Sequence, residues 1–208
     1  MKINQYFFFV GKSMMVKTHS IWINDRLKKI ITYTSSKKCH EIFYLKMYNN
    51  RFLRHGKYKK YFTDGKTIQK QCRYVRGKKE GSVRTFYWNQ RLQSVSNFQH
   101  DKKHGKTIRF FKHGEIQTIE YYQHGKHNGL YLEFFPSGEI YKKARMASGK
   151  PFGNFYVYYP NKAMYEIAYF SDKQLEKVHQ CSINGELKKF FYDFTKEGFS
   201  YIELDSNN

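Results

Sequence analysis

The sequence has few cysteines and few acidic residues. Its 208 residues include three cysteines, Cys39, Cys72 and Cys181, which lie far apart and form no C-x-x-C pair. This spacing does not indicate a disulfide framework, and we therefore expect a reducing compartment. Asp and Glu number 17 against 38 Lys and Arg, which gives a formal net charge of +21 at pH 7.

Long apolar runs are also missing. The N-terminal stretch holds only a short run, Tyr6 to Val10, before Gly11 and Lys12 interrupt it. This is too short for the core of a signal peptide, and no stretch approaches the roughly 18 residues of a membrane span. We therefore expect a soluble protein that is not secreted and has no transmembrane segment. It would be cytoplasmic or lie within a virion or another intracellular assembly.

The apolar residues that are present are largely aromatic. The chain contains 19 Tyr, 19 Phe and 2 Trp, although only 40% of its residues are hydrophobic. Aromatic side chains pack well on the pleated surface of strands, so this composition favours strands over a helical bundle. A chain this aromatic can bury surface, and a disordered basic tail does not account for it.

A repeat organises the chain. Units that begin with glycine cover residues 56–80, 81–104, 105–128, 129–152 and 153–176, the first with 25 residues and the others with 24. The fifth and sixth residues after the leading glycine are aromatic in every unit: Tyr61, Phe62, Phe86, Tyr87, Phe110, Phe111, Phe134, Phe135, Tyr158 and Tyr159. We assign these doublets to a structural aromatic stack along the array. Residues 34–55 show no clear register with the repeat, but the segments that flank the five units resemble degenerate copies of it. We expect the array to span residues 20–194, between an N-terminal cap (1–19) and a C-terminal tail or cap (195–208).

Each unit contains two turn signals. The first pairs are Asp64-Gly65, Asn89-Gln90, His113-Gly114, Ser137-Gly138 and Asn161-Lys162. The second pairs are Arg76-Gly77, His100-Asp101, His124-Gly125, Ser148-Gly149 and Asp172-Lys173. Glycine and asparagine supply the positive φ that tight hairpin turns need. Two strands and two turns in 24 residues form a hairpin, and hairpins joined end to end predict an all-β antiparallel meander.

The pattern G-x-x-x-x-aromatic-aromatic-x-x-G, followed by an apolar strand and a G-K turn, resembles the MORN repeat. The similarity is to the variant found in bacterial antitoxin-like proteins and in large DNA viruses. Residues 105–128 and 129–152 match best, whereas Gln90 and Lys162 replace a turn glycine. The resemblance implies an elongated single-layer antiparallel meander of β-hairpin repeats. It also implies that the array binds proteins and, in some cases, acidic phospholipids.

The positive charge is concentrated in the N-terminal half. Residues 1–104 carry a net charge of +19 and residues 105–208 a net charge of +2. Such a half can contact nucleic acid or anionic membrane lipid. The alternative is that the lysines only solvate exposed strand faces. The candidate anion-binding residues are Lys57, Lys59, Lys60, Lys78, Lys79, Lys102 and Lys103.

Four rings outside the doublets are candidates for a contact surface: Tyr58, Trp88, Tyr131 and Phe155. The sequence gives less support for catalysis or metal binding. The segment Gly11-Lys12-Ser13 ends like a phosphate-binding loop, but Tyr6 replaces the glycine that such a loop requires. The pairs His100 with His104 and His124 with His127 fall in repeat turns without a nearby cysteine, and we expect no metal, no cofactor and no enzymatic activity.

We therefore expect a non-catalytic MORN-repeat scaffold that mediates protein–protein interaction, with a basic N-terminal half able to contact anionic partners. One alternative is a structural component of a large assembly such as a virion, in contact with nucleic acid or membrane. A further alternative is an antitoxin-like partner that neutralises a toxin.

Overall fold

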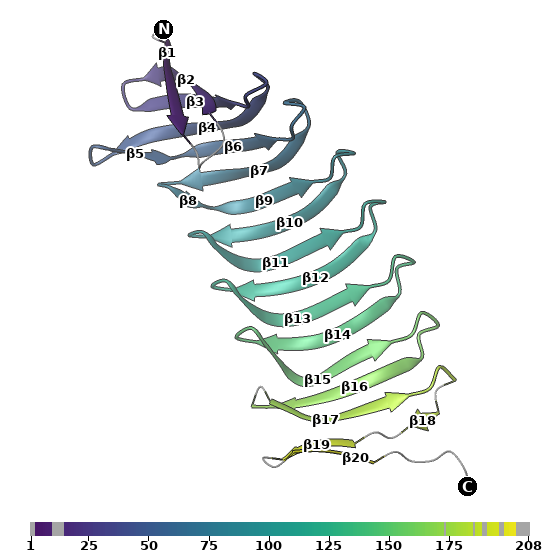
Figure 1. Cartoon of the computed structure of the whole chain (residues 1–208). Coiled ribbons are helices and arrows are strands. Elements are labelled where there is room, and N and C mark those ends of the chain that lie inside the picture. The colour runs from purple at the N-terminus through teal and green to yellow at the C-terminus, as the bar shows by residue number, and fades with distance from the viewer. Residues whose placement is uncertain are drawn as a thin grey trace. The chain divides into compact units, whose positions relative to one another are not determined.

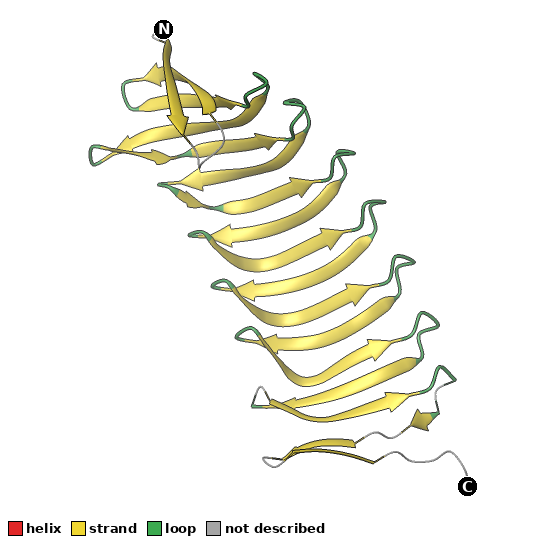
Figure 2. Cartoon of the chain, viewed as in Figure 1, coloured by secondary structure: helices red, strands yellow, loops and turns green. Residues whose placement is uncertain are grey.

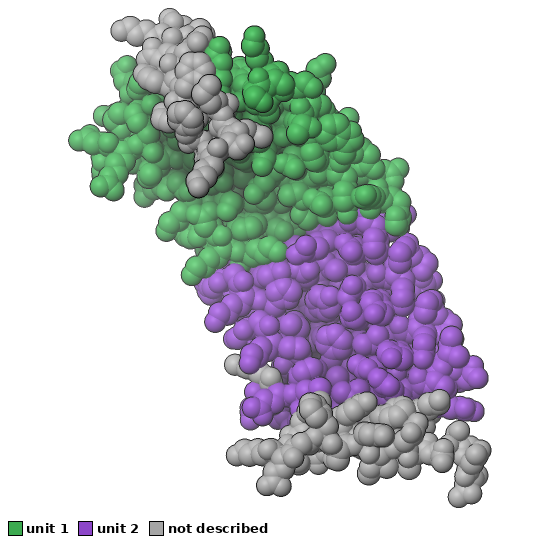
Figure 3. All heavy atoms as spheres, viewed as in Figure 1, with its two compact units in different colours: residues 1–103, 112–114 green, residues 104–111, 115–208 purple. Residues whose placement is uncertain are grey.

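The computed structural model describes residues 3–9, 15–172, 174–184, 186–188, 191–195 and 198–202. These residues form 20 strands, and no helix occurs among them (Figure 2). The chain divides into two compact units, coloured separately in Figure 3. Unit 1 comprises residues 1–103 and 112–114, and unit 2 comprises residues 104–111 and 115–208.

The strands follow one another closely in both units (Figure 1). Those of unit 1 are β1 (Ile3–Phe9), β2 (Met15–Asn24), β3 (Leu27–Tyr33), β4 (Cys39–Tyr48), β5 (Arg51–Arg54), β6 (Gly56–Tyr61), β7 (Ile68–Val75), β8 (Lys78–Lys79), β9 (Gly81–Phe86) and β10 (Leu92–Gln99). Strand β11 (Lys102–Phe110) begins in unit 1 and continues in unit 2, which holds β12 (Ile116–Gln123), β13 (Lys126–Phe134), β14 (Ile140–Ala147), β15 (Lys150–Tyr158), β16 (Met164–Ser171), β17 (Gln174–Cys181), β18 (Leu187–Lys188), β19 (Phe191–Thr195) and β20 (Gly198–Ile202).

Neighbouring strands pair antiparallel, so the predicted all-β meander of consecutive hairpins is confirmed. In unit 2 every strand from β12 to β17 pairs with the strands before and after it. In unit 1 the short strands β5 and β8 are partly bypassed, because β4 also pairs with β6 and β7 also pairs with β9. The resulting sheet is a single layer in which each strand contributes one row of side chains to each face.

The predicted turns adopt the backbone conformation that the sequence pattern requires. The second residue of each first turn has positive φ, from 66° at Gln90 and 69° at Lys162 to 115° at Gly114. Gln90 and Lys162 therefore hold the left-handed conformation without the glycine that other units use. Gly65 shows why glycine is needed at one turn, because a Cβ there would lie 2.8 Å from the backbone nitrogen of Cys39.

The aromatic doublets lie at the ends of strands and at the start of turns. Their first rings are the last residues of β6, β9, β11, β13 and β15. The backbone nitrogen of each second ring donates a hydrogen bond that closes the turn, as from Phe62 to Thr67 O (2.9 Å) and from Phe135 to Glu139 O (2.8 Å). All ten side chains are half-buried. Each doublet thus marks the point where its strand becomes a turn, and the stacking of equivalent rings on one another stays a prediction.

The two faces of the sheet differ in unit 1. Tyr58, Cys72, Tyr74 and Val83 form a buried cluster on one face, which we call the core face. Tyr58 lies opposite Cys72 across the β6–β7 ladder, and its ring meets that of Tyr74 edge to face at a centroid distance of 5.7 Å. Residues between these positions point to the opposite face, which we call the outer face, because side chains alternate along a strand.

The core face of unit 2 buries a carboxylate, whereas the buried polar residues of unit 1, Thr18, Ser20 and Ser96, are uncharged. The buried residues on the core face of unit 2 are Thr107, Thr118, Glu120, Tyr122, Ala144, Val157, Ala168 and Val178. A row at 24-residue intervals runs through the cores of both units, with Cys72 and Ser96 in unit 1 and Glu120, Ala144 and Ala168 in unit 2. The repeat therefore fixes which positions are buried but not which chemistry fills them.

Candidate anion-binding site

Four cationic side chains share the outer face of β6, β7 and β9 in unit 1. Lys57 lies opposite Arg73, and Lys59 lies opposite Gln71, which in turn lies opposite Arg84. All four cations are exposed. We call Lys57, Lys59, Arg73 and Arg84 the basic patch. Adjacent strands are about 4.8 Å apart, so the four charges lie within reach of one extended anionic ligand.

The acidic residues of unit 1 lie elsewhere, and Glu41, Asp64, Glu80 and Asp101 accept hydrogen bonds from other groups. Glu41 is on the core face, Asp64 accepts hydrogen bonds from the backbone nitrogens of Lys66 and Thr67, and Asp25 lies in the β2–β3 turn. Glu80 accepts the backbone nitrogen of His100, and Asp101 accepts that of Lys79. In the part of the chain that the structure describes, no acidic side chain forms a hydrogen bond or ion pair with the side chains of the basic patch.

The basic patch borders a shallow hollow and lies in a positive field. The hollow has a volume of about 240 Å³ and is lined by the four cations together with Gln71, Ser82, Tyr58 and Cys72. Burial, followed by the charges of Lys46, Arg73 and Arg76, lowers the pKa of His55. Neutral hydrogen-bonding groups therefore stand between cations that lack a local counter-ion, which is an arrangement suited to phosphate oxygens.

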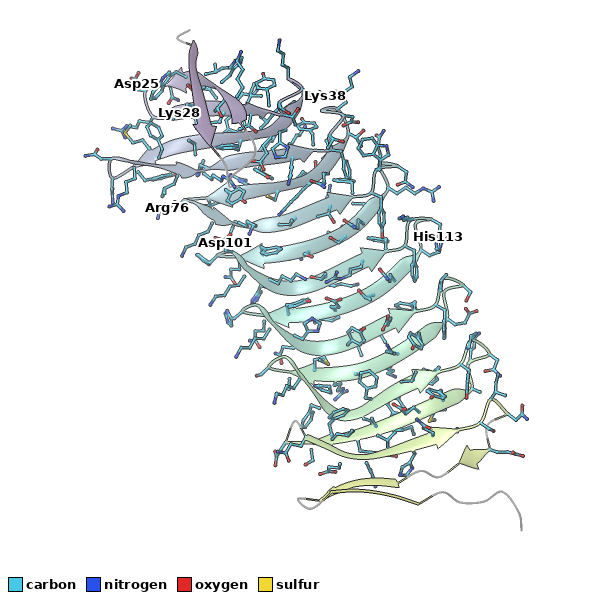
Figure 4. All side chains as sticks on the ribbon, in the orientation of Figure 1. Asp25, Lys28, Lys38, Arg76, Asp101 and His113 are labelled. Carbon is cyan, nitrogen blue, oxygen red and sulfur yellow. The ribbon has the colours of Figure 1, made fainter. Side chains whose placement is uncertain are left out.

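The sequence-predicted lysines are divided among several places. Lys57 and Lys59 belong to the basic patch, but Lys60 lies on the core face, opposite Lys70 and Glu41. Lys78 and Lys79 form β8, and the Lys79 ammonium contacts Asp101 at 3.4 Å. Lys102 and Lys103 begin β11. Figure 4 shows Arg76 and Asp101 in turns along one edge of the unit 1 sheet, with Lys38 and His113 in turns along the other.

Tyr58 belongs to the core, although it also borders the hollow beside the basic patch. Its side chain is only 6% exposed, and its hydroxyl donates to Glu41 Oε1 at 2.7 Å. The Arg54 guanidinium lies 5.4 Å from the centre of its ring and 3.8 Å from Glu41 Oε2. Burial, together with the hydrogen bond to Glu41, raises the pKa of the Tyr58 hydroxyl far above its usual range.

The other three rings also have local partners. Tyr131 donates to Glu133 at 2.9 Å, and Phe155 packs against Phe170 at a centroid distance of 6.5 Å. Trp88 is exposed at a turn and meets Phe62 edge to face at 5.0 Å. Of the four candidate rings, Trp88 is therefore the one that the structure leaves exposed.

A second polar arrangement surrounds Glu120 on the core face of unit 2. Glu120 is 5% exposed and accepts hydrogen bonds from Arg109 Nε (3.1 Å), Thr118 Oγ1 (3.1 Å) and Tyr122 Oη (2.6 Å). Burial, together with the hydrogen bond to Glu120, raises the pKa of Tyr122 well above its usual range. Arg109 balances the charge of the buried carboxylate and the two hydroxyls satisfy its oxygens, so the arrangement is that of a satisfied polar core.

The prediction that both histidine pairs lie in turns holds for only one member of each pair, because His100 and His124 are in turns but His104 lies on β11 and His127 on β13. His127 contacts the Tyr122 hydroxyl and lies 3.7 Å from Glu120, whereas the His104 and His124 rings lie 5.3 Å apart. No group of three or more His, Cys, Asp or Glu side chains suited to a metal ion occurs in the described part of the chain. The cysteines are free thiols, and burial raises the pKa of both Cys39 and Cys72.

Sequence reasoning missed Arg73, Arg84 and Glu120. A signal for the two arginines was present, because the two-residue period of β6 separates Lys57 and Lys59 from Lys60. The same period in the strands that follow places Arg73 and Arg84 with the first two. Glu120 was harder to predict from the sequence, because the equivalent residues Cys72 and Ala144 are uncharged and do not indicate a buried carboxylate.

Comparison with known proteins leaves the chain without an assigned family. No family model and no curated protein matches it. A helix with the length and apolar character needed to cross a membrane does not occur in the segments that the structure describes. Function is therefore inferred from the surfaces of the two units.

Proposed function

We propose that the protein is a non-catalytic binding module of MORN-type hairpin repeats whose basic patch holds a phosphate-bearing partner. One observation carries this proposal. Lys57, Lys59, Arg73 and Arg84 converge on one face, while the acidic residues of the same unit are engaged or turned elsewhere. If the lysines only kept the sheet soluble, the positive and negative side chains would not need to lie on different parts of the unit.

The chemistry of the patch favours phosphate over an isolated carboxylate. Arginine presents a planar fork of donors that suits two oxygens of one phosphate, and lysine adds a point charge. Because the cations come from three adjacent strands, they can contact several phosphates of one extended or clustered ligand. Nucleic acid and phosphorylated lipid share this chemistry, and the experiment must separate them.

The test measures binding of labelled oligothymidylate, and separately of phosphatidylinositol-bisphosphate vesicles, to the full chain across a range of salt concentrations. If four phosphates of a single strand are contacted, the log-log salt slope should be about −3. The Lys59→Ala/Arg84→Ala variant should reduce this slope by about 1.4. The Lys37→Ala/Lys112→Ala variant is the matched control, because both lysines are exposed in turns of unit 1.

Preferential binding of the oligonucleotide would identify a nucleic acid partner, and preferential binding of the vesicles a lipid partner. The proposal fails if both double variants weaken binding equally, because net charge alone would then account for it. It also fails if neither probe binds at low salt.

A further inference from the structure

The outer face changes character in unit 2. Equivalent repeat positions, which hold Lys57, Lys59 and Arg73 in the first clear unit, hold Leu130, Leu132 and Arg145 in the unit at residues 129–152. Apolar side chains gather on this face from β11 to β16: Ile108, Ile119, Tyr121, Leu130, Leu132, Tyr156, Ile167 and Tyr169. Tyr121 and Leu130 are exposed and the others are half-buried. An adjoining group of apolar side chains that remain accessible on one face is typical of an interaction surface.

A hollow of about 400 Å³ opens on this face between β13, β14 and β15. Its lining includes Leu130, Lys143, Arg145, Phe152, Asn154 and Tyr156, and we call it the aromatic hollow. Leu130 lies opposite Arg145, which lies opposite Phe152 on the next strand. The side chains of Leu130 and Phe152 are 37% and 55% exposed, which is high for residues this large and apolar.

A β-bulge forms the aromatic hollow. Ala144 pairs with Phe155 and Arg145 with Phe152, so Gly153 and Asn154 have no direct partners on β14. Bulges change the direction of side chains, and this one places Phe152 opposite Arg145 across the β14–β15 ladder. A Cβ placed on Gly153 would meet no atom within 4 Å, so the space above the bulge is open.

The charge around the aromatic hollow is positive. Lys143 and Arg145 are exposed, and neither pairs with a carboxylate among the described residues. The strand glutamates of unit 2 that could neutralise them lie on the core face. There Glu133 contacts Lys142 at 3.3 Å, and Glu166 accepts a hydrogen bond from Gln180 at 2.9 Å.

This combination identifies the kind of partner. We propose that the aromatic hollow binds an acidic segment of a partner protein. One large apolar side chain of that segment would lie against Leu130 and Phe152, and flanking carboxylates would pair with Lys143 and Arg145. The volume suits one or two side chains, and the unpaired cations require carboxylates in the ligand.

Two other occupants fit less well. A second copy of this chain would bring its own Lys143 and Arg145 and a net charge of +21, and like charges would oppose that contact. A lipid surface would meet the cations, but a concave site with an apolar floor gives one inserted side chain more contact than a headgroup layer can. The phosphate-binding proposal concerns other residues, so either proposal can fail without the other.

The test uses a set of short synthetic peptides in which one Phe, Leu or Trp is flanked on both sides by glutamates. Binding to the full chain is followed by fluorescence anisotropy. We expect Phe152→Ala to weaken the best peptide about tenfold, because a buried apolar contact is lost. The Ile183→Ala variant is the matched control, since Ile183 is 56% exposed in unit 2 and lies outside the hollow.

Charge is tested separately. Arg145→Glu should weaken the peptide about tenfold or more and flatten its salt dependence, whereas Lys126→Glu, the same charge change at the exposed first residue of β13, should have little effect. Arg84→Glu in the basic patch should leave peptide binding unchanged. Far-UV circular dichroism of each variant confirms that the sheet is intact.

Four results would overturn the proposal. One is the absence of binding by every peptide, and another is equal binding of a peptide whose apolar residue is replaced by glycine. A third is dimerisation that depends on Phe152. The fourth is that phosphatidylserine vesicles, or a synthetic peptide of residues 195–208, compete for Phe152 more strongly than the best acidic peptide.

Discussion

On the outer face of unit 1 the repeat positions of β6, β7 and β9 hold Lys57, Lys59, Arg73 and Arg84, whereas in unit 2 the matching face is mostly apolar around Leu130. On the core face the two units are more alike, because each buries three polar side chains: Thr18, Ser20 and Ser96 in unit 1 and Thr107, Thr118 and Glu120 in unit 2. They differ there in charge, since Glu120 is the one buried carboxylate among the described residues. Two units that share one hairpin geometry therefore differ most on the outer face.

The shared geometry comes from turns and strand ends, and not from either face. Each first turn holds a left-handed residue, and each doublet closes that turn through its backbone nitrogen. Because these contacts use the main chain, they place few demands on the side chains of the strand centres. The faces are consequently free to differ, which is how one repeat can offer two unlike binding surfaces.

The largest expected effect tests the apolar core of unit 1. Tyr58→Ala removes a ring that is buried against Cys72 and Tyr74, and it should lower the free energy of unfolding by about 3 to 5 kcal/mol. Urea unfolding can be followed by tryptophan fluorescence, because Trp22 and Trp88 both lie in unit 1. Tyr121→Ala, on the outer face of unit 2, serves as the control. An equal shift for both variants would contradict the assignment of Tyr58 to the core.

The second prediction compares one core-face carboxylate from each unit. Glu120→Gln should lower the free energy of unfolding by about 2 kcal/mol, because it removes the buried carboxylate that pairs with Arg109. The loss is no larger because the Arg109 side chain is half-exposed and solvent screens its charge. Glu41→Gln should cost about 1 kcal/mol, since its partner Arg54 lies 3.8 Å away and is partly exposed. Circular dichroism reports both changes. Equal losses would show that burial of the carboxylate does not distinguish the units.

Most of the fold follows from the sequence, because it depends on patterns that recur. The period of 24, the doublets and the turn dipeptides are local signals, and strand alternation then determines which residues share a face. The sites depend on single substitutions within that pattern. Glu120 stands where other units have Cys72 or Ala144, and Phe152 stands where other units have Glu80, His104, Asn128 or Glu176. The register shift beside Phe152 recurs between β12 and β13 and between β16 and β17, but these two residue types do not recur, so periodicity could not predict them.

The third prediction concerns alkaline pH. Burial, followed by a hydrogen bond to a glutamate, raises the pKa of Tyr58 in unit 1 and of Tyr122 and Tyr131 in unit 2. The folded state therefore holds these protons more tightly than the unfolded chain, whose tyrosines titrate near pH 10. Stability should be unaffected by these groups below that pH and should fall as pH rises above it, by at most about 1.4 kcal/mol per pH unit for each hydroxyl.

The comparison becomes sharper when one hydroxyl is removed. Tyr58→Phe should reduce the alkaline loss that tryptophan fluorescence reports for unit 1, while Tyr121→Phe, at an exposed position, should leave it unchanged. If the Tyr58→Phe protein loses stability with the same pH dependence as the parent, the hydrogen bond to Glu41 does not control that titration.

The smallest expected effect is a gain in stability. It comes from giving a position in unit 2 the residue that unit 1 has at the equivalent position. Thr107 in unit 2 occupies the repeat position of Val83 in unit 1, and its side chain is 1% exposed. Its hydroxyl has no hydrogen-bond partner among the described residues, so the desolvated group is uncompensated. Thr107→Val replaces that hydroxyl with a methyl group of similar shape and should raise the free energy of unfolding by about 1 kcal/mol.

Thr118→Val is the matched control for this exchange, because Thr118 is also buried but its hydroxyl donates to Glu120 at 3.1 Å. It should lower the free energy of unfolding by about 1 kcal/mol. Urea unfolding followed by circular dichroism measures both changes in the free energy of unfolding. Changes of opposite sign would show that a buried threonine hydroxyl stabilises unit 2 only where it donates a hydrogen bond to Glu120. A loss of stability in both would mean that the Thr107 hydroxyl is satisfied in solution, and that the polar core of unit 2 extends further than the contacts of Glu120.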